Sequence, residues 1–284
     1  MRLNEDYVEK SFYKNKNYYE LMERRYDAAK GSLTIEPTTK ELIFRALKSL
    51  KRGAGVLEVG CGVGNNVRWL AERFPEVKFL GSDISEIGIS YALRKINGLT
   101  NLDFVVDDIQ NSNLKNGEFS LIISQSVLEH LTDYRKALRE CSRLLDNNGK
   151  IVIRVGNGGR TGAGLFGFLK DFAKYMLKIN HSKQLTPTFV IDRKDFNGRR
   201  EQHRKNFDVC RIPSDVLVED LKKTGFTIAS FSTYKELIRL TERYKTGAAL
   251  KKKLIDLYVN TGIFPFNHMG RVTILSASKQ VLQI

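Results

Sequence analysis

The chain has 284 residues, of which 42% are hydrophobic, 28% are charged and five are proline. This composition is typical of a folded globular protein and excludes a disordered, collagen-like or disulfide-stapled chain. The three cysteines, Cys61, Cys141 and Cys210, form no C-x-x-C pair, which argues against a disulfide framework and a structural zinc site. The polar N-terminus and the lack of a run of about 18 apolar residues predict a cytoplasmic protein, at most peripheral to a membrane.

The formal net charge is +15, and most of the excess lies in two segments. Residues 157–211 carry 12 basic and 5 acidic side chains, and residues 235–253 carry 7 and 2. Such an excess indicates an anionic partner: a nucleic acid, an anionic membrane surface or an acidic substrate. Because the charge is local, it concerns what those two segments contact rather than the whole fold.

Strands and helices are predicted to alternate along most of the chain. Residues 1–50 read as a helical N-terminal cap that ends in an amphipathic helix at 37–50. Seven short apolar runs follow, at 56–60, 77–83, 102–108, 119–124, 150–155, 226–233 and 271–279. Helical patterns separate them at 66–73, 85–97, 133–145 and 213–226. This spacing predicts an α/β fold with a mostly parallel sheet and helices on both faces.

The first run leads directly into a glycine-rich turn, VLEVGCGVGNN, and then into a helix. Glycines at Gly60, Gly62 and Gly64 allow a tight turn and let a ligand lie against the main chain at a helix N-terminus. A dinucleotide-binding fingerprint would need its last glycine at position 65, where Asn65 stands. The spacing therefore argues against NAD and FAD.

Acidic residues near the ends of the first three strands suggest another ligand. Glu58 would repel a pyrophosphate but favour an ammonium group, and Asp83 is placed to accept hydrogen bonds from ribose hydroxyls. Asp108 could accept from an adenine amine, whereas its neighbour Asp107 is expected to face solvent. An amino acid zwitterion, a ribose and an adenine without phosphate together describe S-adenosylmethionine.

Over residues 53–156 and 203–284 the sequence resembles the class I S-adenosylmethionine-dependent methyltransferases of the small-molecule type, similar to the methyltransferase-11 and quinone O-methyltransferase groups. The motifs are VLEVGCGVGNN, FLGSDIS, FVVDDIQ, FSLIISQSVLEHL and LLDNNGKIVIRV. The resemblance implies a Rossmann-like seven-stranded sheet whose last strand is antiparallel. The core would be 51–156 and 203–284, with a basic helical lid inserted at 157–202 and a second insertion at 234–268.

The resemblance also assigns roles to residues of the cofactor site. Glu58, Gly60, Cys61, Gly62 and Gly64 would line the methionine and ribose part, with Cys61 present as a small residue rather than a nucleophile. The other expected contacts are Asp83 with the ribose hydroxyls, Ile84 against the adenine, Asp108 and Ile109 at the adenine edge, and Ser124 and Gln125 below the sulfonium.

Histidines are the candidate catalytic bases, because an alcohol or phenol acceptor must lose a proton during methyl transfer. His203 is the first choice, since many relatives carry a histidine facing the acceptor before the helix at 214–224. His130 is the second, although a pair of Glu129 and His130 that stabilises the fold is the stronger interpretation. Quinone O-methyltransferases bind a metal through an acid-x-x-Glu-His run; Ser126 replaces the first acid here, so no metal is predicted.

Methyltransferases that act on the amines of adenine, cytosine or glutamine carry an N-P-P-Y-type run after the fourth strand. This chain has SQSV there instead, which disfavours such amine targets and makes oxygen the leading target. Residues 164–179 form an amphipathic pattern with flanking lysines, interpreted as a lid over the pocket or as an interfacial membrane helix. The sequence thus predicts O-methylation of a small or lipid-linked anionic acceptor. An RNA methyltransferase and a non-catalytic cofactor-binding module remain the alternatives.

Overall fold

The computed structural model describes residues 19–20, 35, 37–156, 212, 214–234 and 272–280. The elements are α3 (Pro37–Lys48), β1 (Gly55–Val59), α4 (Asn65–Arg73), β2 (Lys78–Asp83), α5 (Glu86–Leu93), β3 (Leu102–Val106), β4 (Phe119–Gln125), η1 (Leu128–His130), α6 (Tyr134–Leu144), β5 (Leu145–Gly156), α8 (Ser214–Lys223), β6 (Phe226–Tyr234) and β7 (Val272–Lys279). The expected lid, residues 235–268 of the second insertion and most of the N-terminal cap lie outside the described residues.

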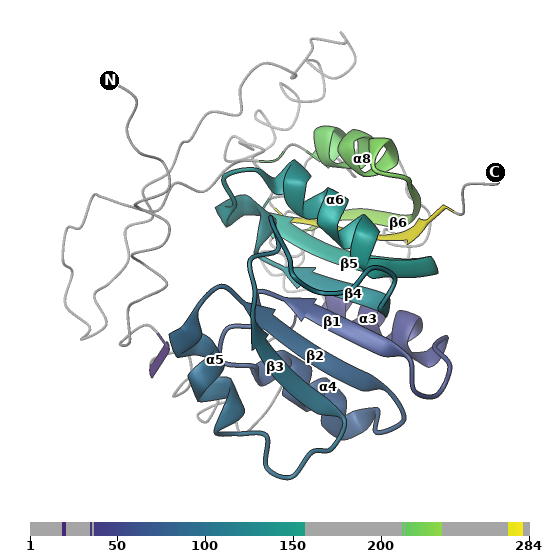
Figure 1. Ribbon diagram of the computed structural model, residues 1–284. Helices are drawn as coiled ribbons and strands as arrows, with labels where there is room; N and C mark the ends of the chain where they lie inside the picture. Colours follow the sequence, from purple (N-terminus) through teal and green to yellow (C-terminus); the bar gives the residue numbers. More distant parts are fainter. Residues whose placement is uncertain are drawn as a thin grey trace, which may run out of the picture.

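The seven strands form one sheet in the order β3-β2-β1-β4-β5-β7-β6 (Figure 1). Strands β1 to β5 pair in parallel, and β7 is antiparallel to both of its neighbours, β5 and β6. The predicted fold class and its antiparallel last strand are therefore confirmed. After β3 the chain returns to pair β4 with the free side of β1, so the strand order reverses beside β1, and ligands bind at the carboxyl ends of the strands at such a point.

Two hydrophobic clusters cover the two faces of the sheet. On one face α3, α4 and α5 pack on residues such as Val56, Phe104 and Ile123. On the other face α6 and α8 pack on residues such as Leu57 and Ile122. Figure 1 shows α6 and α8 together over the β5 and β6 side of the sheet. Neighbouring residues of β1 and β4 thus alternate between the clusters, as a strand buried on both faces requires.

Left-handed or capping residues start three helices at the carboxyl edge of the sheet. Gly64 precedes α4 with φ 72°. The Ser85 hydroxyl accepts from the N–H of Gly88 at 3.1 Å at the start of α5, and Asp133 caps α6 by accepting from the main-chain N–H groups of Arg135 and Lys136. These caps satisfy helix N–H groups that have no partner within the helix, and they fix the turns that carry the candidate site.

The observed elements differ from the predicted ones mainly at their ends. Helix α5 stops at Leu93 rather than near residue 97, and beyond it Asn97 and Gly98 adopt left-handed conformations with φ 50° and 76°. Strand β5 is longer than expected, since residues 145–149 join it before the apolar run begins. No helix among the described residues is long and apolar enough to span a membrane.

Candidate functional site

The three glycines of the turn after β1 all have left-handed main chains, with φ of 66°, 58° and 72° at Gly60, Gly62 and Gly64. A Cβ atom at Gly60 would lie 2.4 Å from a methyl group of Val127, and one at Gly64 would lie 2.5 Å from the ring of Phe104. A Cβ atom at Gly62 would meet nothing within 4 Å. Gly60 and Gly64 are therefore required by packing, whereas Gly62 leaves open space beside the main chain.

Asp83 ends β2 and holds this turn in place. Its Oδ2 accepts from the N–H of Gly62 at 2.8 Å, and its Oδ1 accepts from the N–H of Ser85 at 2.9 Å. The side chain is only 8% exposed, and burial raises the pKa of its carboxyl group while the two N–H groups lower it. A carboxylate has about four lone-pair positions, so two remain for the hydroxyl groups of a ligand.

Glu58 is buried in β1 below the turn, where Gln125 at the end of β4 donates from Nε2 to its Oε1 at 3.2 Å. Its Oε2 lacks a partner of hydrogen-bond geometry among the described residues, although Asn66 and the main chain of Val67 also act on the carboxyl group, and the hydroxyl of Ser124 lacks a partner as well. Burial raises the pKa of Glu58 to about 7, and the side chains of Gln125 and Asn66 counteract this rise. The site thus contains a buried carboxyl group whose charge a nearby cation would stabilise.

Cys61 packs inside the turn rather than acting as an exposed thiol. Its sulfur would lie 3.0 Å from a Cβ atom at Gly81, and the residue packs at the edge of the core on the α4 face. Burial, with the charges of Asp83 and Glu58, raises the pKa of the Cys61 thiol well above its usual value. A thiol with a raised pKa is a poor nucleophile, as the sequence interpretation expects.

The ends of β2 and β3 present two exposed apolar side chains, Ile84 at 37% and Val106 at 45%. Val106 pairs with Asp83 in the sheet, so both apolar groups lie next to the acidic end of β2. Asp108 follows β3, is half-buried and accepts from the N–H of Gln110 at 2.9 Å. Ile109, the next residue, is buried in the α6-side core. The edge thus combines apolar surface with hydrogen-bond acceptors, as an adenine needs.

The expectation that Asp107 faces solvent is wrong. Asp107 is buried at 8% exposure, and its Oδ1 accepts from the N–H of Asn113 at 3.0 Å. Its own N–H donates to the main-chain oxygen of Asp83 at 3.0 Å. The bond from Asn113 in the loop after β3 holds the Asp107 side chain, whereas the next residue, Asp108, is half-buried.

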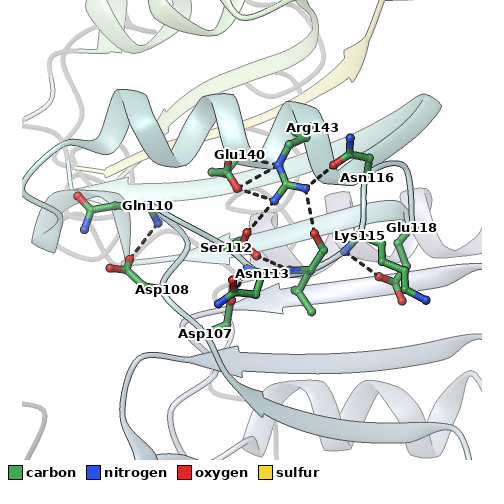
Figure 2. Close-up of polar contacts among 11 residues, drawn as sticks. Asp107, Asp108, Gln110, Ser112, Asn113, Lys115, Asn116, Glu118, Glu140 and Arg143 are labelled. Carbon is green, nitrogen blue, oxygen red and sulfur yellow. Dashed lines mark hydrogen bonds and ion pairs between the residues drawn. The ribbon is translucent and has the colours of Figure 1, made fainter.

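The loop that follows Asp107 is fixed at both ends of α6, and Figure 2 shows the contacts of Arg143. Arg143 donates to the main-chain oxygens of Ser112 at 3.0 Å and Leu114 at 2.9 Å, and it also pairs with Glu140. At the other end of α6, the Oε1 atom of Gln110 accepts from the hydroxyl of Thr132 and from the N–H of Asp133, both at 2.8 Å. Gln110 thereby joins the Asp108 loop to the segment that carries Glu129 and His130.

Glu129 and His130 form η1, between β4 and α6. Oε1 of Glu129 accepts from the N–H of Gly156 at 3.1 Å, and the side chain is 5% exposed. Burial raises the pKa of Glu129, while the positive charge of Arg154 lowers it. This bond joins η1 to the end of β5, which supports a structural role for Glu129. His203, the other candidate base, lies outside the described residues, as does the lid.

Several residues at this edge received no site role from the sequence. Val106, Gln110 and Arg154 lie inside the quoted motifs, and Ser126 was considered only as the replacement of a metal-binding acid; their positions follow from strand ends that meet only in the folded sheet. Within the part of the chain that is described, no three acidic, histidine or cysteine side chains gather as a metal site would require.

Comparison with known proteins agrees with this geometry. Residues 56–149 match the family model described as a methyltransferase domain. Phosphoethanolamine N-methyltransferase 1 of Arabidopsis thaliana is 34% identical over 117 residues, which cover 41% of this chain and 23% of that protein. Malonyl-[acyl-carrier protein] O-methyltransferase 1 of Ilyobacter polytropus is 34% identical over 103 residues, 36% of this chain and 38% of that protein. The matches thus span well under half of either relative.

Solved structures share the fold over most of the chain. An S-adenosylmethionine-dependent methyltransferase from Methanosarcina mazei superposes with a TM-score of 0.55 at 18% identity, covering 88% of this chain and 100% of that one. Phosphoethanolamine N-methyltransferase 2 of Haemonchus contortus, solved with S-adenosyl-L-methionine, gives 0.54 at 16% identity and covers 86% of this chain and 53% of that one. At these identities the likeness concerns the fold.

Proposed function

Because residues 56–149 match a methyltransferase-domain family model, we propose that the protein transfers the methyl group of S-adenosylmethionine to a small or lipid-linked anionic acceptor, first of all at oxygen. The observation that carries the proposal is the meeting of the glycine turn, Asp83, Glu58 and Asp108 at the sheet edge where the strand order reverses. The glycine spacing at this edge does not match the dinucleotide-binding fingerprint, and the edge presents hydrogen-bond acceptors and apolar side chains instead.

The residues present fit this cofactor. Asp83 would bind the ribose hydroxyls with its two remaining lone-pair positions, and the open space at Gly62 would admit the ligand against the main chain. Ile84 and Val106 would pack on the adenine, with Asp108 at its edge. The free oxygen of Glu58 and the hydroxyl of Ser124 would find partners among the polar groups of the methionine part.

S-adenosylmethionine supplies a methyl group bound to a positively charged sulfur, which is already a good leaving group. The protein then needs to hold the acceptor in line and, for a hydroxyl acceptor, to remove its proton. In the balanced reaction the acceptor oxygen gains the methyl group, its proton passes to a base, and the thioether leaves with the sulfur electron pair. We propose His203 as that base, with His130 as the second candidate.

We infer an anionic acceptor from the places where the two basic segments, residues 157–211 and 235–253, leave the sheet. Strand β5 ends at Gly156 and the parallel strand β6 ends at Tyr234, so both segments start at the carboxyl edge. Residues 157–211 and 235–253, with their 12 and 7 basic side chains, follow these two ends. Positive charge close to a pocket mouth attracts and retains acidic substrates.

An amine acceptor is the second candidate within the same function. Several relatives with matching segments are phosphoethanolamine N-methyltransferases, whose names indicate an amine that carries a phosphate. The buried carboxyl group of Glu129, with one oxygen free of described partners, would suit an ammonium group. An amine that carries a phosphate is also an anionic acceptor, so both candidates share the same charge requirement.

The direct test is methyl transfer from labelled S-adenosylmethionine to fractionated small-molecule, lipid and RNA extracts of the source cell. We expect label in an acidic small-molecule or lipid product. Label only in RNA, retained at physiological salt, would favour an RNA methyltransferase instead. Bound cofactor without transfer to any fraction would favour a non-catalytic binding module.

The segment 164–179 lies outside the described residues, and we propose that it covers the acceptor and contacts anionic membrane surfaces from the cytoplasm. Its apolar residues recur at helical spacing with lysines beside them. The test is sedimentation with vesicles that contain anionic lipid. Deleting the segment should abolish the association, whereas equal sedimentation with and without it would leave only the covering role.

A further inference from the structure

Ser126, the first residue after β4, has a main-chain conformation that serine rarely adopts, with φ 56°. Two contacts with Arg154 of β5 hold it there. The N–H of Ser126 donates to the main-chain oxygen of Arg154 at 2.7 Å, and Nη1 of Arg154 donates to the hydroxyl of Ser126. Non-glycine residues in this region are concentrated at functional sites, where the surrounding structure maintains the strain.

The guanidinium of Arg154 keeps most of its donors for other partners. It has five N–H groups, and within the described residues its one side-chain hydrogen bond goes to Ser126. Among the described residues, no carboxylate oxygen lies within 4.0 Å of its guanidinium nitrogens, so it forms no ion pair there. Its charge nevertheless acts on Glu129, whose pKa it lowers. The group is half-buried, so a bound anion would be partly shielded from water.

Glu129 lies beside this cation and has a free acceptor. One carboxyl oxygen accepts from the N–H of Gly156, two residues beyond Arg154, and the other lacks a partner of hydrogen-bond geometry among the described residues, although the side chain of Ser126 also lowers the pKa of Glu129. Buried polar atoms almost always have a partner, and an exception calls for an explanation such as a ligand. Arg154, a cation with unused donors, and Glu129, a carboxyl group with an unused acceptor, therefore both lie at the end of β5.

The position of this pair suits a methyl acceptor. The glycine turn follows β1, and β4 and then β5 lie next to it in the sheet. Neighbouring strands are spaced by almost 5 Å, so the pair is roughly 10 Å from the turn, across Gln125 and Ser126. A small acceptor bound by the pair could span this distance and place its reacting atom near the turn.

We propose that Arg154 and Glu129 form the acceptor subsite, in which Arg154 binds a phosphate or carboxylate of the acceptor and Glu129 accepts a hydrogen bond from a donor group on the same molecule. This inference rests on the proposed methyltransferase function and gives its acceptor a recognition site. The planar guanidinium can bind either anion through two parallel hydrogen bonds. An acceptor with one anionic and one donor group would satisfy both residues.

The test is calorimetric titration of the full chain saturated with S-adenosylhomocysteine, which blocks turnover. The probes are phosphoethanolamine, glycerol 3-phosphate, 3-aminopropionate and ethanolamine, so that phosphate, carboxylate and amine contributions separate. We expect the probes with an anion to bind and ethanolamine to bind more weakly. Arg154→Met should lower the affinity for the anionic probes about tenfold or more and leave the affinity for S-adenosylhomocysteine unchanged.

Two variants distinguish recognition from a purely structural role. Ser126→Gly relieves the left-handed strain and removes the hydroxyl that Arg154 contacts, so it should keep anion binding if Arg154 itself binds the anion. Glu129→Gln keeps an acceptor for the N–H of Gly156, and it should lower the affinity for phosphoethanolamine more than the affinity for glycerol 3-phosphate.

Equal affinity of the wild type and Arg154→Met for the anionic probes would overturn the inference, and so would a wild type that binds none of them. A chain that fails to bind S-adenosylhomocysteine would instead overturn the proposed function, and the subsite with it. Tighter binding of phosphate than of carboxylate probes would identify the anion.

Discussion

Asp83 accepts a hydrogen bond from the main-chain N–H of Gly62 at 2.8 Å, so the acidic end of β2 directly fixes the glycine turn that follows β1. The same carboxylate accepts from Ser85 at the start of α5. One side chain therefore orders two neighbouring turns at the carboxyl edge and still has capacity for ligand hydroxyls.

The first prediction contrasts two glycines of the turn. Gly62→Ala adds a methyl group to open space, so its cost to stability should be that of the left-handed conformation alone, about 1 kcal/mol. It should nevertheless weaken S-adenosylmethionine binding, because the methyl group occupies the space proposed for the ligand. Gly60→Ala would also clash with Val127 and should destabilise the fold more strongly. Denaturant unfolding and calorimetry measure the two effects, and equal behaviour of the two variants would contradict the assignment.

The second prediction concerns the pH dependence of stability through Glu58. Burial raises its pKa to about 7 in the folded protein, compared with 4.5 ordinarily, so the folded state binds more protons than the unfolded state between these values. The free energy of unfolding should therefore fall as the pH rises through this window, by roughly 3 kcal/mol for this group. Asp83 and Glu129, whose pKa values are also raised, contribute with the same sign.

Glu58→Gln removes one titrating group and keeps an acceptor for Gln125. Urea unfolding at about pH 5 and pH 8 should show a smaller loss of stability in this variant than in the wild type. If both proteins lose the same stability over that range, Glu58 does not have a raised pKa in the folded state.

The third prediction tests Gln110 as a positioning residue. Its Oε1 only accepts hydrogen bonds, from Thr132 and Asp133, so Gln110→Glu should preserve cofactor affinity while Gln110→Leu should weaken it roughly five- to tenfold. Thr132→Val should have little further effect in the Gln110→Leu background, because both changes break the same contact. Fully additive losses would show that the two side chains act independently.

The fourth prediction concerns the far face of the sheet. Asp220 of α8 accepts from the hydroxyl of Tyr134 at 2.5 Å and from Nε of Arg135 at 2.7 Å, both at the start of α6. Asp220→Ala should lower the free energy of unfolding by about 2 kcal/mol, mainly through the loss of the buried Tyr134 contact, since Arg135 is largely exposed. Tyr134→Phe should cost less in that background than in the wild type, and cofactor affinity should not change in either variant.

Much of the fold could be predicted from the sequence because the strands are short apolar runs and the helices between them have polar caps. Val56, Leu57 and Ile123 carry that pattern, and the structure places them in the two cores. The end of α5 was missed because Asn97 is tolerated in a left-handed conformation that only the structure reveals.

The meeting of Asp83 and Asp108 at one edge of the sheet was also accessible from sequence, because they follow successive strands and parallel strands bring their ends together. The burial of Asp107 was not accessible, since it depends on a contact with Asn113 six residues later. The contact between Arg154 and Ser126 was missed for a related reason: the two residues are 28 apart in the chain and meet only through the pairing of β4 with β5.

The most direct test of the central claim is calorimetric titration of S-adenosylmethionine into the wild type, Asp83→Ala and the control Asp103→Ala, which removes an exposed carboxylate near the amino end of β3. The wild type and Asp103→Ala should bind with the same affinity. Asp83→Ala should bind about a hundredfold more weakly or worse, because it loses charged hydrogen bonds to two ribose hydroxyls as well as its hold on Gly62. Unchanged affinity in Asp83→Ala, with the fold intact, would contradict the proposed site.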